Sequence, residues 1–528
     1  MITHTENNAP ETTPLTDPRG IYVLIAVCCV AIATPFCFTG IAVGLPTISR
    51  VIGGTPIQLN WAINSFLLTF GSTLMAAGAL ADNYGRKRLL LTGLAIFGFF
   101  SVSLSFAVNI MWFDLLRAMQ GLGAAGAFAG GFASLAQEFD GTARLRAFSI
   151  VGTSFGIGLA FGPVAAGWLI AHFGWQAIFV LVLMLSAIAL LFAAIFMRES
   201  RDPDASGLDW KGAVIFTLAL SAFTFGIIQG PESGWSNPLV IGLLAGSASL
   251  FVLFVLVERA AKRPMLDLSL FLFPRFVGAQ LLAIVPSFAF VALLVLLPVR
   301  FIGIQGMSEF AAGQLMVALS APFLILPIVS GLITRWFAPA TICGAGLAIS
   351  AAGLYWLSHF SVTTDPVALI GPLLTIGVGI SLPWGLMDGL AVSVVPKERA
   401  GMATGIFSTS RVAGEGVALA IVTALFSALI KTNLSTVAGS NASAVAQRLV
   451  TGNLKEASAL VASVQRETLL QGYDKGFTAT LWFLCGITVL TALIVFLFLG
   501  RSHETVENIE HEVDEAVRHG LHSGEKTP

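Results

Sequence analysis

Glu415 is a carboxylic acid inside a long apolar stretch, residues 402–430, where a free charge is expensive. It stands about 13 residues into that stretch, roughly 20 Å along a helix, near the middle of a hydrocarbon core about 30 Å thick. An isolated charge there costs about 2.5–3.5 kcal/mol on insertion scales. A carboxyl group escapes this cost by taking up a proton, so Glu415 is a candidate proton carrier. The alternative is a static ion pair with Arg411, one turn earlier on the same face.

A second acid, Asp388, lies in the apolar stretch 367–394. Trp384 is one helical turn away on the same face and follows Pro383. A helix that is broken by proline and presents an aromatic ring and an acid indicates a binding wall. We therefore assign Trp384, together with Arg411, to a substrate cavity and Asp388 to proton coupling. A core Trp beside a solvated Asp is an equally good alternative.

A charged pair also lies in the stretch 112–136, where Asp114 stands three residues before Arg117. At this spacing the two side chains share one face of a helix and can pair. A buried Arg in a membrane span is costly and is usually functional. We assign both residues to proton coupling, and the alternative is a static ion pair near the outer surface.

Motifs for other chemistry are absent from the sequence. There is no GxxxxGK[ST] loop to hold ATP phosphates and no HExxH zinc motif. The five cysteines form no CxxC pair, so they indicate neither a disulfide framework nor a zinc site. We therefore expect no cofactor, no metal site and an activity driven by a proton gradient. A membrane enzyme or scaffold is the least favoured class of protein.

The composition requires a membrane protein. The chain is 56% hydrophobic and 11% charged, whereas soluble domains carry about 25% charged residues. Its net charge of −1 predicts no nucleic-acid partner. A membrane span needs roughly 20 apolar residues, and about fourteen stretches qualify. They are residues 21–46, 57–80, 89–108, 112–136, 147–170, 175–197, 211–229, 238–257, 276–299, 310–333, 341–358, 367–394, 402–430 and 477–499.

Basic residues predict the orientation of these spans, because Lys and Arg accumulate in short cytoplasmic loops. Alternate loops are rich in bases, beginning with Arg86-Lys87-Arg88, and this places both termini in the cytoplasm. The short outside loops hold only Arg50 and Arg300. Residues 431–476 form a long outside loop, in which 442–470 is predicted to be an amphipathic helix. The acidic tail 503–519 is expected to be a solvated helix, with a partner-binding helix as the alternative.

Three motifs carry a resemblance to a known family. The loop from Gly78 to Arg88, with Asp82, Gly85 and Arg86, closely resembles the signature loop of the major facilitator superfamily. The segment Gly158-Leu-Ala-Phe-Gly162-Pro163-Val-Ala-Ala-Gly167 resembles the antiporter signature of its drug:proton exporters. The segment Leu116-Arg117-Ala-Met-Gln120-Gly121-Leu-Gly123-Ala-Ala resembles a third motif, in the fourth helix. Together they resemble the fourteen-helix drug:H+ antiporter family over roughly residues 20–500.

This resemblance implies roles and a fold. The loop with Gly78, Asp82, Gly85 and Arg86 is implied to be a latch that holds the cytoplasmic side closed. Arg117 is implied to take part in proton coupling. The helix with Gly158, Gly162, Pro163 and Gly167 is implied to favour export over import. The expected fold is all-α, with two six-helix halves around a midplane cavity and two extra helices between them in sequence.

The sequence also departs from this family. Many relatives carry an acid and an Asn in the first helix, where this chain has Cys37 and Ala42. Arg300 stands where relatives often have Tyr. These changes argue against recognition of cations in the first helix and favour non-cationic cargo.

We therefore predict a proton-coupled exporter of amphipathic, drug-like compounds in the cell inner membrane. The alternative is dedicated export of one endogenous metabolite or siderophore. We expect a monomer in the lipid bilayer, and an exporter of this kind also has the option of a periplasmic adaptor and an outer-membrane channel. The predicted segments are a tail (1–20), the first half (21–200), two added helices (201–262), the second half (263–500) and an acidic tail (501–528).

Overall fold

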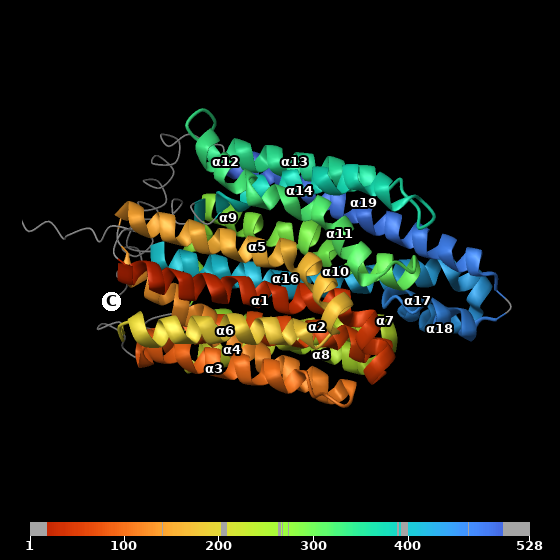
Figure 1. Ribbon diagram of the computed structural model, residues 1–528, viewed down its shortest axis with the longest axis horizontal. Helices are drawn as coiled ribbons and strands as arrows, with labels where there is room; N and C mark the ends of the chain where they lie inside the picture. Colours follow the sequence, from red (N-terminus) through yellow and green to blue (C-terminus); the bar gives the residue numbers. More distant parts are fainter. Residues whose placement is uncertain are drawn as a thin grey trace, which may run out of the picture.

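The protein is a bundle of long helices (Figure 1). The computed structural model describes residues 18–139, 141–201, 209–261, 266, 268–272, 274–387, 390–391, 400–462 and 464–499. Within those ranges, thirteen helical segments are long and apolar enough to cross a membrane. A fourteenth, the 29-residue helix that carries Asp114 and Arg117, packs among them. The prediction of an all-α membrane protein with about fourteen spans is therefore confirmed.

The first half of the bundle consists of six long helices. They are α1 (Pro18–Ile52), α2 (Pro56–Tyr84), α3 (Arg86–Leu104), α4 (Ile110–Glu138), α5 (Gly141–Phe173) and α6 (Ala177–Phe196). α4 packs against α2 and α3, while α1 packs against α5 and α6. Glycines permit the closest approaches: a Cβ added at Gly93 of α3 would lie 2.3 Å from the backbone nitrogen of Ala127 in α4.

The second half contains six further membrane-crossing segments, several of them interrupted. They are α9 (Pro274–Pro286) with η2 (Ser287–Val291), α10 (Ala292–Pro298) and η3 (Val299–Ile304); α11 (Glu309–Ser320) with η4 (Ala321–Leu324) and α12 (Leu326–Ile333); α13 (Pro339–Leu357); η5 (Pro366–Leu369) with α14 (Ile370–Trp384); α16 (Ala400–Ala438); and α19 (Arg466–Leu499). A short helix, η1 (Leu268–Leu272), precedes α9. α13 packs against α14 and α19, and α16 packs against α19 and α9.

The halves meet along two seams. At one seam α5 packs against α11, and at the other α2 packs against α16. Both seams are closed by glycine. A Cβ at Gly71 of α2 would lie 2.8 Å from the Cα of Ala413, and a Cβ at Gly167 of α5 would lie 2.5 Å from the carbonyl oxygen of Glu309.

Two added helices follow the first half in sequence. α7 (Trp210–Ser233) and α8 (Pro238–Ala260) pack on each other, and α7 also packs against α2 and α16. The pair therefore lies beside the α2/α16 seam and does not separate the two halves. Only 17% of the apolar span of α8 is buried, as expected for a helix that faces lipid.

Several predicted helices are broken or have other lengths. The span predicted at 276–299 contains one π-helical turn, η2, after Pro286, and a second, η3, follows Pro298 and extends the span to Ile304. Proline has no backbone N–H to donate, so the pattern of backbone hydrogen bonds in the helix changes there. The span predicted at 310–333 is interrupted at η4, and the helix predicted at 367–394 ends at Trp384. Asp388 lies outside the described residues, as do the tails 1–17 and 500–528.

The segment predicted as one amphipathic helix at 442–470 is instead two short helices. They are α17 (Ala442–Val450) and α18 (Leu454–Leu460), which follow η7 (Gly439–Asn441). Gly452, with φ +80°, ends the first helix in a conformation that other residues rarely adopt. We call residues 439–462 the cap, and the end of the bundle where α17 and α18 lie the cap end (Figure 1). The opposite end, which carries Arg86, Lys87 and Arg88, is the basic end.

The cap is folded onto the bundle. α17 buries Val445 and Leu449 completely and packs against α2 and α7. Gly452 interlocks with Gly303 of η3, since a Cβ at Gly303 would lie 2.5 Å from the Cα of Gly452. An ion pair between Arg448 and Glu456 joins the two cap helices. The cap is therefore a packed structure and not a loose loop.

Candidate functional site

Arg411 and Glu415 lie one turn apart on α16, at the centre of the bundle. Their side chains are 1% and 0% exposed. The guanidinium carbon of Arg411 lies 5.1 Å from the ring centroid of Phe155, which belongs to α5 in the other half. A second ring, Phe407, lies 5.7 Å from it. The face of α16 that carries Arg411 is therefore directed at the first half, while the substrate cavity stays a prediction.

Trp384 contributes the other side of this interface. Its ring stacks on Phe155 at 6.4 Å and 16°, and it lies 5.6 Å from Phe323 and 6.4 Å from Phe290. Its Nε1 donates to the carbonyl oxygen of Gly152 at 3.4 Å. We call Phe155, Phe290, Phe323 and Trp384 the aromatic cluster. The predicted wall residue Trp384 therefore lies between the two halves, beside the aromatic side chain that faces Arg411.

Glu415 is a buried acid that accepts no hydrogen bond within the described part of the chain. Neither carboxylate oxygen has a hydrogen-bond partner among the described residues, although the charge of Arg411 acts on the group. Both amide atoms of Gln280 in α9, which packs against α16, are likewise unsatisfied within the described part of the chain. Buried polar groups are normally hydrogen-bonded, so these groups need a proton, water or a ligand. Gln280 was not predicted, because a Gln in an apolar stretch gives no signal of its place in the fold.

Arg117 lies in a separate polar network in the first half. Its Nε donates to the carbonyl oxygen of Ala62 at 2.9 Å, and its Nη1 donates to Gln120. Gln120 in turn donates to Ser101 Oγ at 2.8 Å. The guanidinium also lies 4.5 Å from the ring centroid of Phe66. This arginine therefore joins α4 to α2 and, through Gln120, to α3.

The predicted pairing of Asp114 with Arg117 is wrong. Oδ1 of Asp114 is buried without a hydrogen-bond partner among the described residues, and Arg117 acts on the acid only at longer range. The thiol of Cys37 in α1 also lies close enough to Arg117 for the two groups to interact electrostatically. The residue that replaces the expected first-helix acid thus faces the fourth-helix arginine, a contact that residue spacing within one helix cannot reveal.

The charged turn at the basic end is tightly connected. Arg86 pairs with Asp82 at 2.8 Å and donates to Gln137 of α4 at 2.7 Å. The carboxylate of Glu199 accepts from the backbone nitrogens of Lys87 and Arg88, both at 3.2 Å, and so caps α3. Among the described residues these contacts all lie within the first half, so a latch between the halves stays a prediction.

The two glycines of this turn differ. Gly85 has φ +118°, and a Cβ there would lie 2.5 Å from Glu199 Oε1, so this position requires glycine. A Cβ at Gly78 would meet nothing within 4 Å. Gly78 therefore makes no close helix contact in this conformation of the chain.

The small residues of α5 have two partners. A Cβ at Gly158 would lie 2.3 Å from the carbonyl oxygen of Ile32, and one at Gly162 would lie 1.9 Å from Thr39 Oγ1, so both glycines pack on α1. Gly167 packs on α11 across the α5/α11 seam. α5 passes through Pro163 as one helix. Glycines of α5 therefore permit close packing against α1 in the first half and against α11 in the second half.

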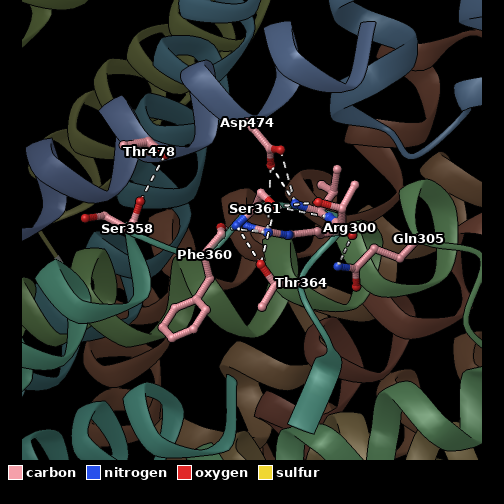
Figure 2. Close-up of polar contacts among 10 residues, drawn as sticks. Arg300, Gln305, Ser358, Phe360, Ser361, Thr364, Asp474 and Thr478 are labelled. Carbon is pink, nitrogen blue, oxygen red and sulfur yellow. Dashed lines mark hydrogen bonds and ion pairs between the residues drawn. The ribbon is translucent and has the colours of Figure 1, made fainter. Parts of the chain in front are cut away.

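Another buried arginine, Arg300, lies at the cap end of the second half. Arg300 is fully buried in η3, contrary to its prediction as an outside-loop residue. It pairs with Asp474 at 3.8 Å and donates to the carbonyl oxygen of Phe360 at 3.1 Å (Figure 2). Its guanidinium carbon also lies 4.4 Å from the ring centroid of Phe477. Asp474 also accepts from the backbone nitrogen of Val362 at 2.9 Å. The cluster ties η3, the segment after α13 and α19 together.

Two packed halves of membrane-crossing helices, with charged and aromatic groups buried where the halves meet, define a membrane transporter rather than an enzyme. The chain belongs to the Major Facilitator Superfamily, whose family model matches residues 27–419. Solved structures share the fold. A bacterial homologue of the human lysosomal transporter Spinster, in an inward-facing conformation, matches 92% of this chain and 98% of its own with a TM-score of 0.59 at 17% identity. A D-xylose–proton symporter matches with a TM-score of 0.58, at 14% identity, over 91% and 97% of the two chains.

Several similar proteins are named as resistance or export proteins. Multidrug resistance protein Stp of Mycobacterium tuberculosis is 31% identical over 74% of this chain and 73% of its own length. A methylenomycin A resistance protein of Bacillus subtilis is 28% identical over 77% and 87%. A tetracenomycin C resistance and export protein of Streptomyces glaucescens is 24% identical over 95% and 96%.

Proposed function

We propose that the protein exports amphipathic, drug-like compounds in exchange for protons. The observation that carries the proposal is Glu415, a fully buried acid whose oxygens lack hydrogen-bond partners among the described residues, beside an aromatic interface between the halves. Such an acid is costly when charged and is relieved by a proton. The similarity to drug-resistance and efflux proteins supports export as the direction of transport.

The aromatic cluster and Arg411 are the proposed contacts for cargo. Aromatic rings provide a large apolar surface, and the guanidinium and Glu415 offer one charge of each sign. Binding of cargo and binding of a proton at Glu415 would then compete for the same buried charge. This competition is the physical basis of exchange, because one ligand leaves as the other binds.

We propose that the basic end faces the cytoplasm, which puts the cap outside the cell inner membrane. Arg86, Lys87 and Arg88 at one end of the bundle support this orientation through the positive-inside rule. We further propose that the protein acts as a monomer and needs no cofactor. A periplasmic adaptor with an outer-membrane channel could also bind it, and the cap would be the surface on which the adaptor docks.

Dedicated export of a single natural product is the second candidate function. Two of the similar proteins are named for resistance to individual antibiotics, methylenomycin A and tetracenomycin C. A panel of structurally unrelated compounds, tested in an efflux-deficient host, separates the two candidates. Protection against many compounds supports the first function, and protection against a single chemical class supports the second.

The direct test is transport of a fluorescent amphiphile into proteoliposomes under an imposed pH gradient. The wild-type protein is expected to accumulate the dye only with the gradient. Glu415→Gln keeps the side-chain volume but cannot cycle a proton, so gradient-driven transport should be lost in a folded protein. Glu467→Gln, at an exposed acid in the first turn of α19, is the matched control and should transport normally. Full activity of Glu415→Gln would contradict the proposed role.

A further inference from the structure

We propose that the α5/α11 seam holds an intramembrane site for one acyl chain of a membrane phospholipid. A cavity of about 440 Å³ lies where α5, α6 and α11 meet. Its longest wall is one face of α5, from Phe161 to Leu169, and Leu181 of α6 together with Phe310 and Gln314 of α11 completes it. Apart from the amide of Gln314, the lining side chains are hydrocarbon or aromatic, so the site suits an apolar ligand.

The position of the cavity shows that its open side faces lipid and not water. Trp168 and Phe310 line the cavity and are 47% and 40% exposed on the outside of the bundle. All three helices that form its walls belong to membrane-crossing segments. The medium that meets these exposed rings is therefore lipid, and not water or cargo held at the centre of the bundle.

The dimensions of the cavity fit one chain of one leaflet. The wall from Phe161 to Leu169 covers eight helical steps, or about 12 Å. One leaflet contributes about half of a 30 Å hydrocarbon core. The wall also ends near polar groups: the ring centroid of His172 lies 4.9 Å from that of Trp168, and Glu309, next to Phe310, pairs with Arg50 at 3.2 Å. A lipid headgroup would lie at this polar rim, where Trp rings gather at membrane interfaces.

The site exists only while the halves are closed at the cap end. Its α5 and α6 walls belong to the first half, and its α11 wall belongs to the second. The two walls are held together by the contact of Gly167 with Glu309 and by that of Gly313, where a Cβ would lie 3.4 Å from the carbonyl oxygen of Pro163. A ligand that needs both walls stabilises the state in which they are together. The bound chain would therefore favour closure at this end.

Quenching of Trp168 by brominated phosphatidylcholine in proteoliposomes tests the proposal without any transport. The signal of Trp168 is the difference between the wild-type protein and Trp168→Phe. A matched control is Val180→Trp in the Trp168→Phe background, because Val180 precedes Leu181 on α6 and is 49% exposed. We expect Trp168 to be quenched at mole fractions of brominated lipid that leave the control unquenched, since a fixed site holds its lipid longer than the bulk bilayer does.

Two variants extend the test. Ala165→Phe would fill the cavity, and Gly167→Ala would separate its walls, so both should lose the additional quenching of Trp168. Equal quenching of the two positions in all lipid mixtures would overturn the proposal. Relief of the quenching by a neutral amphiphile that the protein exports would also overturn it, because the cavity would then be a cargo site. If Ala165→Phe fails to fold, the comparison with the control position still decides.

Discussion

Gly167→Ala should shift the protein toward states that are open at the cap end. The added methyl would lie 2.5 Å from the carbonyl oxygen of Glu309, so α11 would have to retreat by about 1 Å to reach an ordinary contact of 3.4 Å. Overpacking of this kind costs about 1–3 kcal/mol. The cost applies only while α5 and α11 are in contact. The equilibrium should therefore move about 5- to 150-fold away from the closed state.

Hydrogen exchange of the backbone amides in the first turns of α11 measures this shift. The variant should exchange faster there at an unchanged melting temperature. Gly158→Ala is the matched control on the same helix, because its methyl would lie 2.3 Å from the carbonyl oxygen of Ile32 within the first half. That change should lower the melting temperature in every state. If Gly167→Ala lowers the melting temperature and leaves α11 exchange unchanged, the seam is ordinary packing and not a moving contact.

Three further predictions concern the turn, the cap and the cargo. Asp82→Asn should slow turnover more than it weakens cargo binding, because its ion pair with Arg86 lies far from Glu415; a lost affinity at an unchanged rate in the transport assay would contradict this. Gly303→Ala should loosen the cap from η3, because the added methyl would lie 2.5 Å from the Cα of Gly452; faster amide exchange in α17 would show this, and unchanged exchange would contradict it. Neutral or zwitterionic amphiphiles should be exported at least as well as monovalent cations, and permanent dications poorly, because the centre offers one buried acid and one arginine among the described residues. Selective protection of cells against dications in a matched dose–response panel would refute the last expectation.

The sequence predicted the helices well and their partners poorly. Apolar length fixes a membrane span, so the number of spans and the buried place of Glu415 followed from composition and position alone. The breaks at η2 and η3 did not, because a proline in an apolar stretch is compatible with either a kink or a continuous helix. α5 continues through Pro163, while the helix rearranges after Pro286.

Contacts between side chains of different helices were predicted less well than the helices themselves. Asp114 and Arg117 share a helix face, so they were expected to pair, but Arg117 instead donates hydrogen bonds to Ala62 and Gln120. The choice among these partners depends on how α2 is rotated against α4. Spacing along a single helix carries no information about that rotation.

One feature of α16 has a mechanical consequence. The helix runs unbroken for 39 residues, about 58 Å, and Glu415 and the root of the cap stand about 35 Å apart on it. A tilt of 10° about Glu415 would carry the root of the cap through about 6 Å. Proton uptake at Glu415 and movement of the cap would then be mechanically coupled through α16. Because coupling of this kind is reciprocal, a molecule that clamps the cap would also change how tightly Glu415 holds its proton.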